Sequence, residues 1–377
     1  MPAYHQMGHH STNLLLEQNL ARLQGAFLSP VNADQAEVID IIRRAQEARP
    51  DLEMIFDPQL YFPQSNRGQL KTWSHFPSDV DTADIGSWAW WSGTSAAVAR
   101  VVQDVRPQSA CSPAVVPRTF SSNDYYSTMV DVGDDLATRV PGAAVLQTLL
   151  VGIDDISVRF RAEEVASIIS RAAARRVFLV VCTDVEPRRE LADVEGLKGV
   201  MRLIRLVEDG GQRVTVGFTS SDIALWKAAG ATSCASGKFF NLRRFTKSRF
   251  EEPSGGGGQL PYWMEEGMLG FLRTSDVVRV RNAGHFSSAT MRNPYTTPIL
   301  SLIDSGGTWL AESWRQYLWW FADFEARADR ATVRASLRHA ESVWTALDDS
   351  EVLMEEPRND GSWIRQWRRA VAEFDAP

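Results

Sequence analysis

The sequence predicts a (β/α)8 barrel of the TIM type, an α/β fold, with a helical C-terminal extension. The first observation is that short apolar runs alternate with amphipathic stretches from about residue 25 to residue 285. The second is that these runs are apolar on both faces, which is typical of parallel strands covered by helices. The third is their number, because eight such units favour a closed barrel over an open sheet.

The expected strands end at short breaks that contain Pro, Asn or Asp. They cover residues 25–31, 52–57, 112–117, 144–153, 176–184, 213–219, 231–237 and 275–281. The stretches between them carry apolar residues at helical spacing, as at Val38, Ile41, Ile42 and Ala45. The expected helices of the barrel cover residues 33–49, 94–105, 123–139, 162–175, 196–208 and 222–229.

Two segments interrupt this repeat, and a third follows it. Residues 63–92 show little periodicity and predict a long loop, and Ser254–Gly258 predicts a flexible linker or mobile loop. After His285 the chain is rich in tryptophan, with expected helices over 308–326, 331–347 and 361–374. We therefore expect an N-terminal arm (1–24), a catalytic barrel (25–290) and a Trp-rich helical extension (291–377).

The composition is that of a folded protein without a membrane span or a disulfide framework. In 377 residues, 44% are hydrophobic and 23% charged, which excludes global disorder. No apolar run approaches the roughly 18–20 residues that span a bilayer, and no secretory signal is visible, so a cytoplasmic protein is expected. Three distant cysteines (Cys111, Cys182, Cys234) argue against disulfides and a CxxC zinc site. No histidine has paired ligand spacing, so we expect no metal or other cofactor, although a magnesium ion held by carboxylates would leave no such pattern.

Acidic residues follow three of the expected strands. Asp57, Asp155 and Asp184 stand where the carboxyl ends of barrel strands meet, an end called the mouth below, and barrels build their active sites there. Paired carboxylates are what the cleavage of glycosidic bonds requires, because one stabilises the sugar cation and another handles a proton or water. The alternative is that these aspartates form turns or cap helices.

A basic and aromatic segment follows the seventh expected strand. Residues 238–249 contain five cations and no acid, although the formal net charge of the whole chain is −7. Barrels often bind phosphate near this position, which makes this segment a candidate nucleic-acid backbone clamp. The clamp would consist of Lys238, Arg243, Arg244, Lys247 and Arg249. The alternatives are packed phenylalanines with solvated arginines, or Lys238 as a Schiff-base nucleophile.

Substrate-binding candidates lie in the long loop and after the sixth expected strand. Tyr61, Trp88 and Trp90 offer rings on which an extruded base would stack, and Ser220 and Ser221 offer hydroxyl groups. The alternative for the tryptophans is that they cover the rim of the barrel.

Three phrases carry a resemblance to a known family. Residues 56–63 (FDPQLYFP), 217–222 (GFTSSD) and 236–244 (SGKFFNLRR) resemble the transglycosylase-like barrels, relatives of the tRNA-guanine transglycosylases and of enzymes that insert deazaguanines into DNA. Within this group the chain is most similar to bacterial phage-defence DNA glycosylases that excise glucosylated hydroxymethylcytosine. The resemblance covers about residues 20–290.

The resemblance implies a barrel that holds a modified base and breaks its N-glycosidic bond with aspartates. Asp57, Asp155 and Asp184 are the positions that match this role. Three scattered cysteines cannot form the zinc subdomain of the tRNA enzymes, and their serine–aspartate–serine motif followed by paired glycines is absent, which disfavours tRNA base exchange. We therefore expect a DNA glycosylase of antiviral defence that acts on modified phage DNA and leaves an abasic site. We expect it to bind no membrane and to need no obligate protein partner.

Two other classes of function stay open at this point. One is a barrel hydrolase or transglycosylase that acts on nucleosides, small glycosides or tRNA bases, with the basic segment binding a phosphate. The other is a non-catalytic protein whose Trp-rich helices form an interface with a partner.

Overall fold

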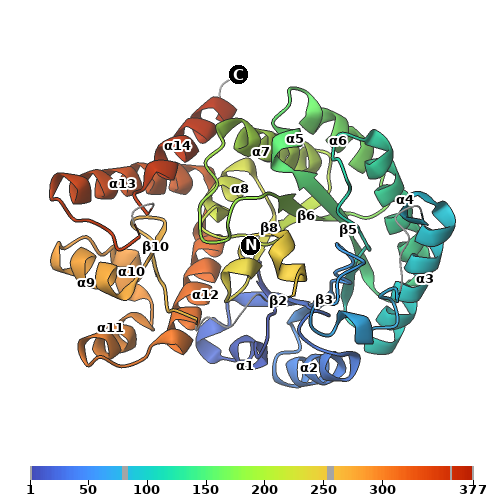
Figure 1. Ribbon diagram of the computed structural model, residues 1–377, viewed down its shortest axis with the longest axis horizontal. Helices are drawn as coiled ribbons and strands as arrows, with labels where there is room; N and C mark the ends of the chain where they lie inside the picture. Colours follow the sequence, from blue (N-terminus) through green and yellow to red (C-terminus); the bar gives the residue numbers. More distant parts are fainter. Residues whose placement is uncertain (1, 79–83, 253–258, 357–358, 376–377) are drawn as a thin grey trace.

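Eight parallel strands close into a barrel in the order of the chain. The computed structural model describes residues 2–78, 84–252, 259–356 and 359–375, and β1 pairs with β8 to close the ring, with Ala3 opposite Cys234 (Figure 1). The strands are β1 (Ala3–Gln6), β2 (Leu23–Leu28), β3 (Glu53–Phe56), β4 (Ser109–Cys111), β5 (Ala144–Gly152), β6 (Arg176–Cys182), β7 (Arg213–Val216) and β8 (Ser233–Ser236). The predicted fold class is confirmed.

Amphipathic helices cover the outside of the barrel. They are α2 (Gln35–Ala48), α3 (Trp88–Val105), α4 (Asn123–Arg139), α6 (Arg161–Ile169), α7 (Val194–Asp209) and α8 (Ile223–Ala229), with the short α1 (Thr12–Leu15) and α5 (Ile153–Ile156). In α7 the buried side chains include Leu197, Val200, Ile204 and Val207, spaced three or four residues apart. This spacing gives one apolar face that packs on the strands.

A second layer of helices follows the barrel. The hairpin β9 (Trp263–Glu265) and β10 (Gly270–Leu272) leads to α9 (Thr274–Asn282), α10 (Ser288–Arg292), α11 (Thr296–Asp304), α12 (Leu310–Arg327), α13 (Arg330–Asp349) and α14 (Ser362–Asp375), at the left of Figure 1. α12 packs against β1 and β8. The segment expected as an extension therefore supplies a helix of the barrel wall, and its tryptophans Trp309 and Trp320 are buried there.

The prediction of the eighth strand at residues 275–281 was wrong. This segment is the helix α9, because Val277 and Val280 lie one helical turn apart and both are fully buried. The missing strand is β1, inside the residues expected to form an N-terminal arm. The sequence of β1 is not an apolar run, because it contains the polar residues His5 and Gln6. Both are buried and contact barrel backbone: His5 Nδ1 lies 3.2 Å from the Ser236 carbonyl oxygen, and Gln6 Oε1 accepts from the Phe218 amide.

Other boundaries differ by a few residues for local reasons. β4 occupies residues 109–111 rather than 112–117, where Pro113 and Pro117 cannot donate to a strand ladder. α3 begins at Trp88, inside the expected loop, because the Ser87 hydroxyl caps it by accepting from the Trp90 amide. Residues 79–83 of that loop and the expected linker Ser254–Gly258 lie outside the described residues.

Short 3-10 turns occupy part of the connections. They cover Gln18–Leu20, Leu70–Thr72, Asp84–Gly86, Phe240–Leu242 and Lys247–Phe250. No helix in the described ranges is long and apolar enough to cross a membrane.

Candidate functional site

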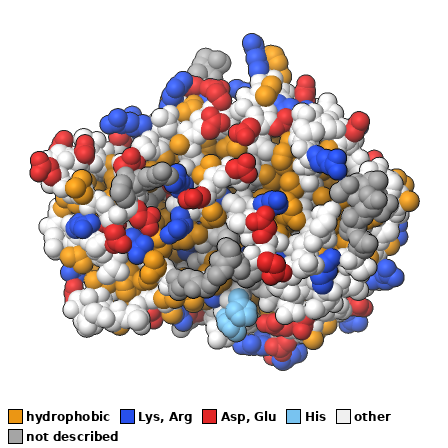
Figure 2. Space-filling view, viewed as in Figure 1, with side chains coloured by type: hydrophobic (Ala, Val, Ile, Leu, Met, Phe, Trp, Pro, Cys, Tyr) orange, Lys and Arg blue, Asp and Glu red, His pale blue; other side chains and the backbone are white. Residues whose placement is uncertain are grey.

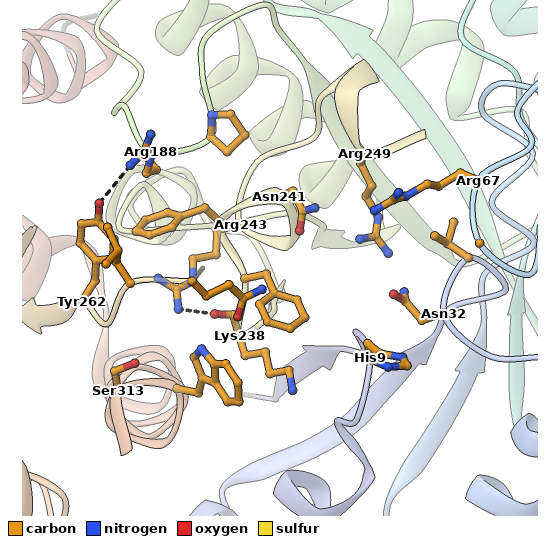
Figure 3. A pocket seen from close by; sticks show the side chains of 18 of the residues that line it. His9, Asn32, Arg67, Arg188, Lys238, Asn241, Arg243, Arg249, Tyr262 and Ser313 are labelled. Atoms are coloured by element: carbon orange, nitrogen blue, oxygen red, sulfur yellow. Dashed lines mark hydrogen bonds between the residues drawn. The ribbon is translucent and has the colours of Figure 1, made fainter. Parts of the chain in front are cut away.

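A cavity of about 810 Å³ opens at the mouth of the barrel (Figure 3). The segments after β1, β2, β3, β6 and β8 line it, together with α12. Its cationic lining residues are Arg67, Arg188, Lys238, Arg243 and Arg249, and none of the described residues that line it is acidic. This cavity, called the mouth cavity below, therefore favours an anionic ligand.

Two arginines from distant segments meet on one wall of the mouth cavity. Arg249 and Arg67 point toward one another in Figure 3, and their like charges interact. Arg249 is 4% exposed, its Nη2 donates to the Ser29 hydroxyl at 3.1 Å, and its buried Nε has no partner. Burial lowers the pKa of Arg249 to about 10, so the guanidinium is still charged at neutral pH. Neither arginine forms an ion pair with a described residue, and an anion between them would supply the missing charge.

Lys238 lies across the mouth cavity from these arginines (Figure 3). Its Nζ donates to the His10 carbonyl at 3.3 Å and lies 4.2 Å from the centre of the Trp314 ring. Burial, and to a lesser degree the charge of Arg315, lowers the pKa of Lys238 to about 8. Lys238 is thus, after Arg249, a second buried cation of the mouth cavity, and its ammonium group lies against a ring rather than in an ion pair with a described residue.

The other predicted clamp residues have partners elsewhere. Arg243 donates to the carbonyls of Gly237 and Lys238 and stacks 3.4 Å from the centre of the Tyr317 ring, so it braces the backbone of the segment. Arg244 lies between Glu190 and Asp222, and its side chain is 2% exposed. The alternative of solvated arginines was therefore wrong for Arg243, Arg244 and Arg249, which are all buried. Lys247 is exposed, outside the mouth cavity, and pairs with Glu251.

Asp57 is a buried acid at the end of β3. Pro58 follows it directly, and the carboxylate accepts from the Gln59 amide and lies 3.0 Å from the Tyr61 hydroxyl. Burial, which outweighs these hydrogen bonds and the charge of Arg249, raises the pKa of Asp57 to about 6. Asp57 does not itself line the mouth cavity, but it is in electrostatic contact with Arg249, which does.

The structure does not bring the other two aspartates to the mouth cavity. Asp155 lies in the first turn of α5, where it accepts from Arg161 Nε at 3.0 Å. Asp184 follows β6 and is exposed to solvent. Neither residue lines the cavity.

The predicted substrate-binding residues are also dispersed. Tyr61 is buried against Asp57, Trp88 is 50% exposed at the start of α3, and Trp90 packs edge-on against Trp91. Ser220 and Ser221 are fully buried beside α8. The rings that line the mouth cavity are instead Phe239, Phe240, Tyr262 and Trp314.

Sequence reasoning missed Glu190 and Arg67. Glu190 lies in the loop between β6 and α7, its side chain is 7% exposed, and it accepts from Ser221 Oγ at 2.5 Å. Neither residue directly follows an expected strand, which was the criterion that selected Asp57 and Asp184. No pattern in the sequence distinguishes them from ordinary loop residues.

The described residues hold no group of three or more His, Cys, Asp or Glu that could bind a metal ion. All three cysteines are buried and unpaired.

Comparisons with known proteins identify no family for this chain. No protein-family model and no curated protein matches the chain in sequence. Among solved structures, it is similar to the putative copper homeostasis protein CutC of Streptococcus agalactiae, with a TM-score of 0.39 and 10% identity over 65% of this chain and 100% of that one. It is also similar to the homocysteine methyltransferase MmuM of Escherichia coli in its apo form, with a TM-score of 0.36 and 12% identity over 63% and 90%. At these scores neither likeness carries an argument.

Proposed function

We propose that the protein is a DNA glycosylase that hydrolyses the N-glycosidic bond of a modified base held at the barrel mouth. The observation that carries this proposal is the set of cations in the mouth cavity, Arg67, Lys238 and Arg249, which form no salt bridge with a described carboxylate, Asp57 acting on Arg249 only at longer range. Lys238 and Arg249 are buried, and leaving a buried charge without a salt bridge is costly. The site therefore favours an anion, and a phosphate of the DNA backbone fits that requirement.

The size and the lining of the mouth cavity suit one extruded nucleotide. Its volume of about 810 Å³ is within the range of pockets that hold small molecules, and it is too confined for a duplex. Phe239, Phe240, Tyr262 and Trp314 provide rings on which a base would stack. The target base would therefore leave the helix before cleavage.

Asp57 is the predicted acid that the proposal retains. It is buried at the mouth and linked electrostatically to the mouth cavity through Arg249. Ionised at neutral pH, it would stabilise the positive charge that develops on the deoxyribose as the bond to the base breaks. The family assignment and the choice of glucosylated hydroxymethylcytosine as substrate rest on the resemblance in residues 56–63, 217–222 and 236–244.

A second candidate is a hydrolase of small phosphorylated glycosides or nucleotides. It is favoured by the face of the molecule in Figure 2, where acidic and basic side chains are interspersed without a continuous cationic track. The net charge of −7 also opposes binding to long nucleic acids. This candidate predicts turnover of free nucleotides and a weak dependence of substrate binding on salt.

The test is incubation of the purified protein with DNA that contains glucosylated hydroxymethylcytosine, with unmodified DNA and with free nucleotides. The glycosylase predicts abasic sites and released base from the modified DNA alone. Asp57→Asn should abolish this activity, whereas Asp51→Asn, an exposed change in the turn that precedes the same strand, should not. Turnover of free nucleotides without any change in DNA would favour the second candidate instead.

A further inference from the structure

A second cavity adjoins the mouth cavity. It has a volume of about 640 Å³ and lies between the loop after β6 and the segment that precedes α14. Arg188, Phe240 and Tyr262 line both cavities, and the Arg188 guanidinium donates to the Tyr262 hydroxyl at 3.1 Å (Figure 3). A nucleotide whose phosphate occupies the mouth cavity can therefore stack its base on Phe240 and Tyr262, which line both cavities, and extend it into the second cavity.

Glu190 is the buried carboxyl group that reaches the second cavity. Its side chain is 7% exposed and lines the cavity wall. One oxygen accepts from Ser221 Oγ at 2.5 Å, and the other lies 3.4 Å from Arg244 Nη2. Residues of the segments that follow β7 and β8 thus hold this carboxyl group in place.

Arg244 stabilises the charged form of Glu190 less than it would in an ordinary ion pair. Arg244 is shared, because its Nη1 also lies 3.7 Å from Asp222 Oδ2, so one guanidinium serves two buried carboxylates. Burial, which outweighs the attraction of Arg244, raises the pKa of Glu190 to about 7. The other charged groups near it are Arg243 after β8, Glu186, Arg188 and Arg189 on its own loop, and Glu355, Glu356 and Asp360 across the cavity.

A second side chain of this cavity has an unmet hydrogen bond. Trp363 of α14 lines the cavity and is 6% exposed, and its indole N–H has no partner among the described residues. A buried N–H normally finds an acceptor. This donor and the carboxyl group of Glu190 together suit a polar heterocycle that offers both an acceptor and a site for protonation.

We propose that Glu190 is the general acid of the reaction and that the departing base occupies the second cavity. This inference rests on the proposed glycosylase function. In the step, the C1′–N bond breaks and its electron pair goes to the base nitrogen, which takes the proton of Glu190. The oxygen of a water molecule bonds to C1′ and its surplus proton passes to solvent, from which Glu190 is later reprotonated. A general acid in this position typically contributes about 100-fold or more to the rate.

The experiment measures single-turnover base release from the modified DNA as a function of pH. For the wild type the rate should fall above about pH 7, because Glu190 must carry its proton. Glu190→Gln should lower the rate about 100-fold or more. It should also remove the fall of the rate above pH 7, called the alkaline limb below, while DNA affinity and thermal stability are retained. The loss should shrink on a substrate whose base is a better leaving group. Glu195→Gln, an exposed change at the start of α7, is the matched control and should behave as the wild type.

Ser221→Ala keeps the carboxyl group and tests the same inference if Glu190→Gln fails to fold. Ser221 donates to the Glu190 carboxylate and so lowers its pKa, and its loss should move the alkaline limb to higher pH. If the alkaline limb of Ser221→Ala is unchanged, or if Glu190→Gln is as fast as the wild type, the role of Glu190 is overturned and the glycosylase proposal stands. A wild type that releases no base from any DNA would overturn both this role and the glycosylase proposal.

Discussion

Lys227 of α8 and Glu325 of α12 form an ion pair of 3.0 Å in which the two side chains are 1% and 0% exposed. Lys227 Nζ also donates to the Ala231 carbonyl at 2.6 Å. The pair joins a helix of the barrel to a helix that lies about a hundred residues further along the chain. A second link joins the same helix to the barrel, because the hydroxyl groups of Ser236 on β8 and Tyr317 on α12 are 2.6 Å apart. The barrel and α12 therefore share one interior.

Replacing one member of this pair should destabilise the whole protein. Lys227→Met leaves the Glu325 carboxylate buried without its partner, and we expect a loss of about 3–5 kcal/mol in the free energy of unfolding at pH 8, measured by urea denaturation. Burial already raises the pKa of Glu325 to about 7, and removing the lysine raises it further, so the loss should be smaller at pH 5, where the carboxyl is neutral. The double variant Lys227→Met with Glu325→Met should regain most of the stability. A double variant as unstable as the single one would contradict this account.

Removing one cation from the mouth cavity should change how DNA binding depends on salt. Arg249→Met should weaken binding to a modified oligonucleotide and lower the slope of log K against log salt by about 0.9, the contribution of one neutralised phosphate. Fluorescence anisotropy at several salt concentrations measures this slope. Arg213→Met makes the same chemical change at the exposed first residue of β7, at the opposite end of the barrel, and serves as the control. Equal slopes in both variants would place the phosphate elsewhere.

Asp57 should make a component of the stability depend on pH. Its pKa in the folded protein, about 6, is above the value of 3.8 for the free side chain. The neutral form is thus favoured by folding, and its contribution is present below pH 4 and lost as the pH rises through 6. Asp57→Asn lacks this loss, so its stability relative to the wild type should increase by on the order of 3 kcal/mol between pH 4 and pH 7.5. Urea midpoints at the two pH values give this difference, and a constant gap would show that Asp57 is not buried as described.

Two helical glycines should respond in opposite directions to alanine. A Cβ on Gly199 of α7 would lie 2.0 Å from the Ile156 carbonyl oxygen, so Gly199→Ala must push α5 away and should destabilise the protein. A Cβ on Gly93 of α3 meets nothing within 4 Å, so Gly93→Ala should stabilise it by about 0.5–1 kcal/mol through helix propensity. Thermal denaturation of the two variants measures both effects. A shift of the same sign in both would exclude this packing at Gly199.

The sequence by itself determined the barrel, because a strand that is buried on both faces requires consecutive apolar residues, and such a run is visible in the sequence. The strands β5 to β8 and the helix α4 were predicted close to their observed bounds for this reason. The same rule failed at β1, where His5 and Gln6 bond to barrel backbone instead of forming an apolar run. It failed again at α9, where three valines within four residues suit a strand and a helix equally well.

Only some of the residues of the two cavities could be predicted from the sequence. The position of Asp57 after a strand predicted its place at the mouth, and the basic composition of residues 238–249 predicted a cationic wall, of which Lys238, Arg243 and Arg249 line the cavity. Which cations have partners depends on contacts across the fold, since Arg244 meets Glu190 from another loop and Arg67 meets Arg249 over a separation that no local pattern records. Charge pairing and desolvation act between residues that are close in space, whereas periodicity acts between residues that are close in sequence. Only the tertiary structure could therefore decide which charges are left for a ligand.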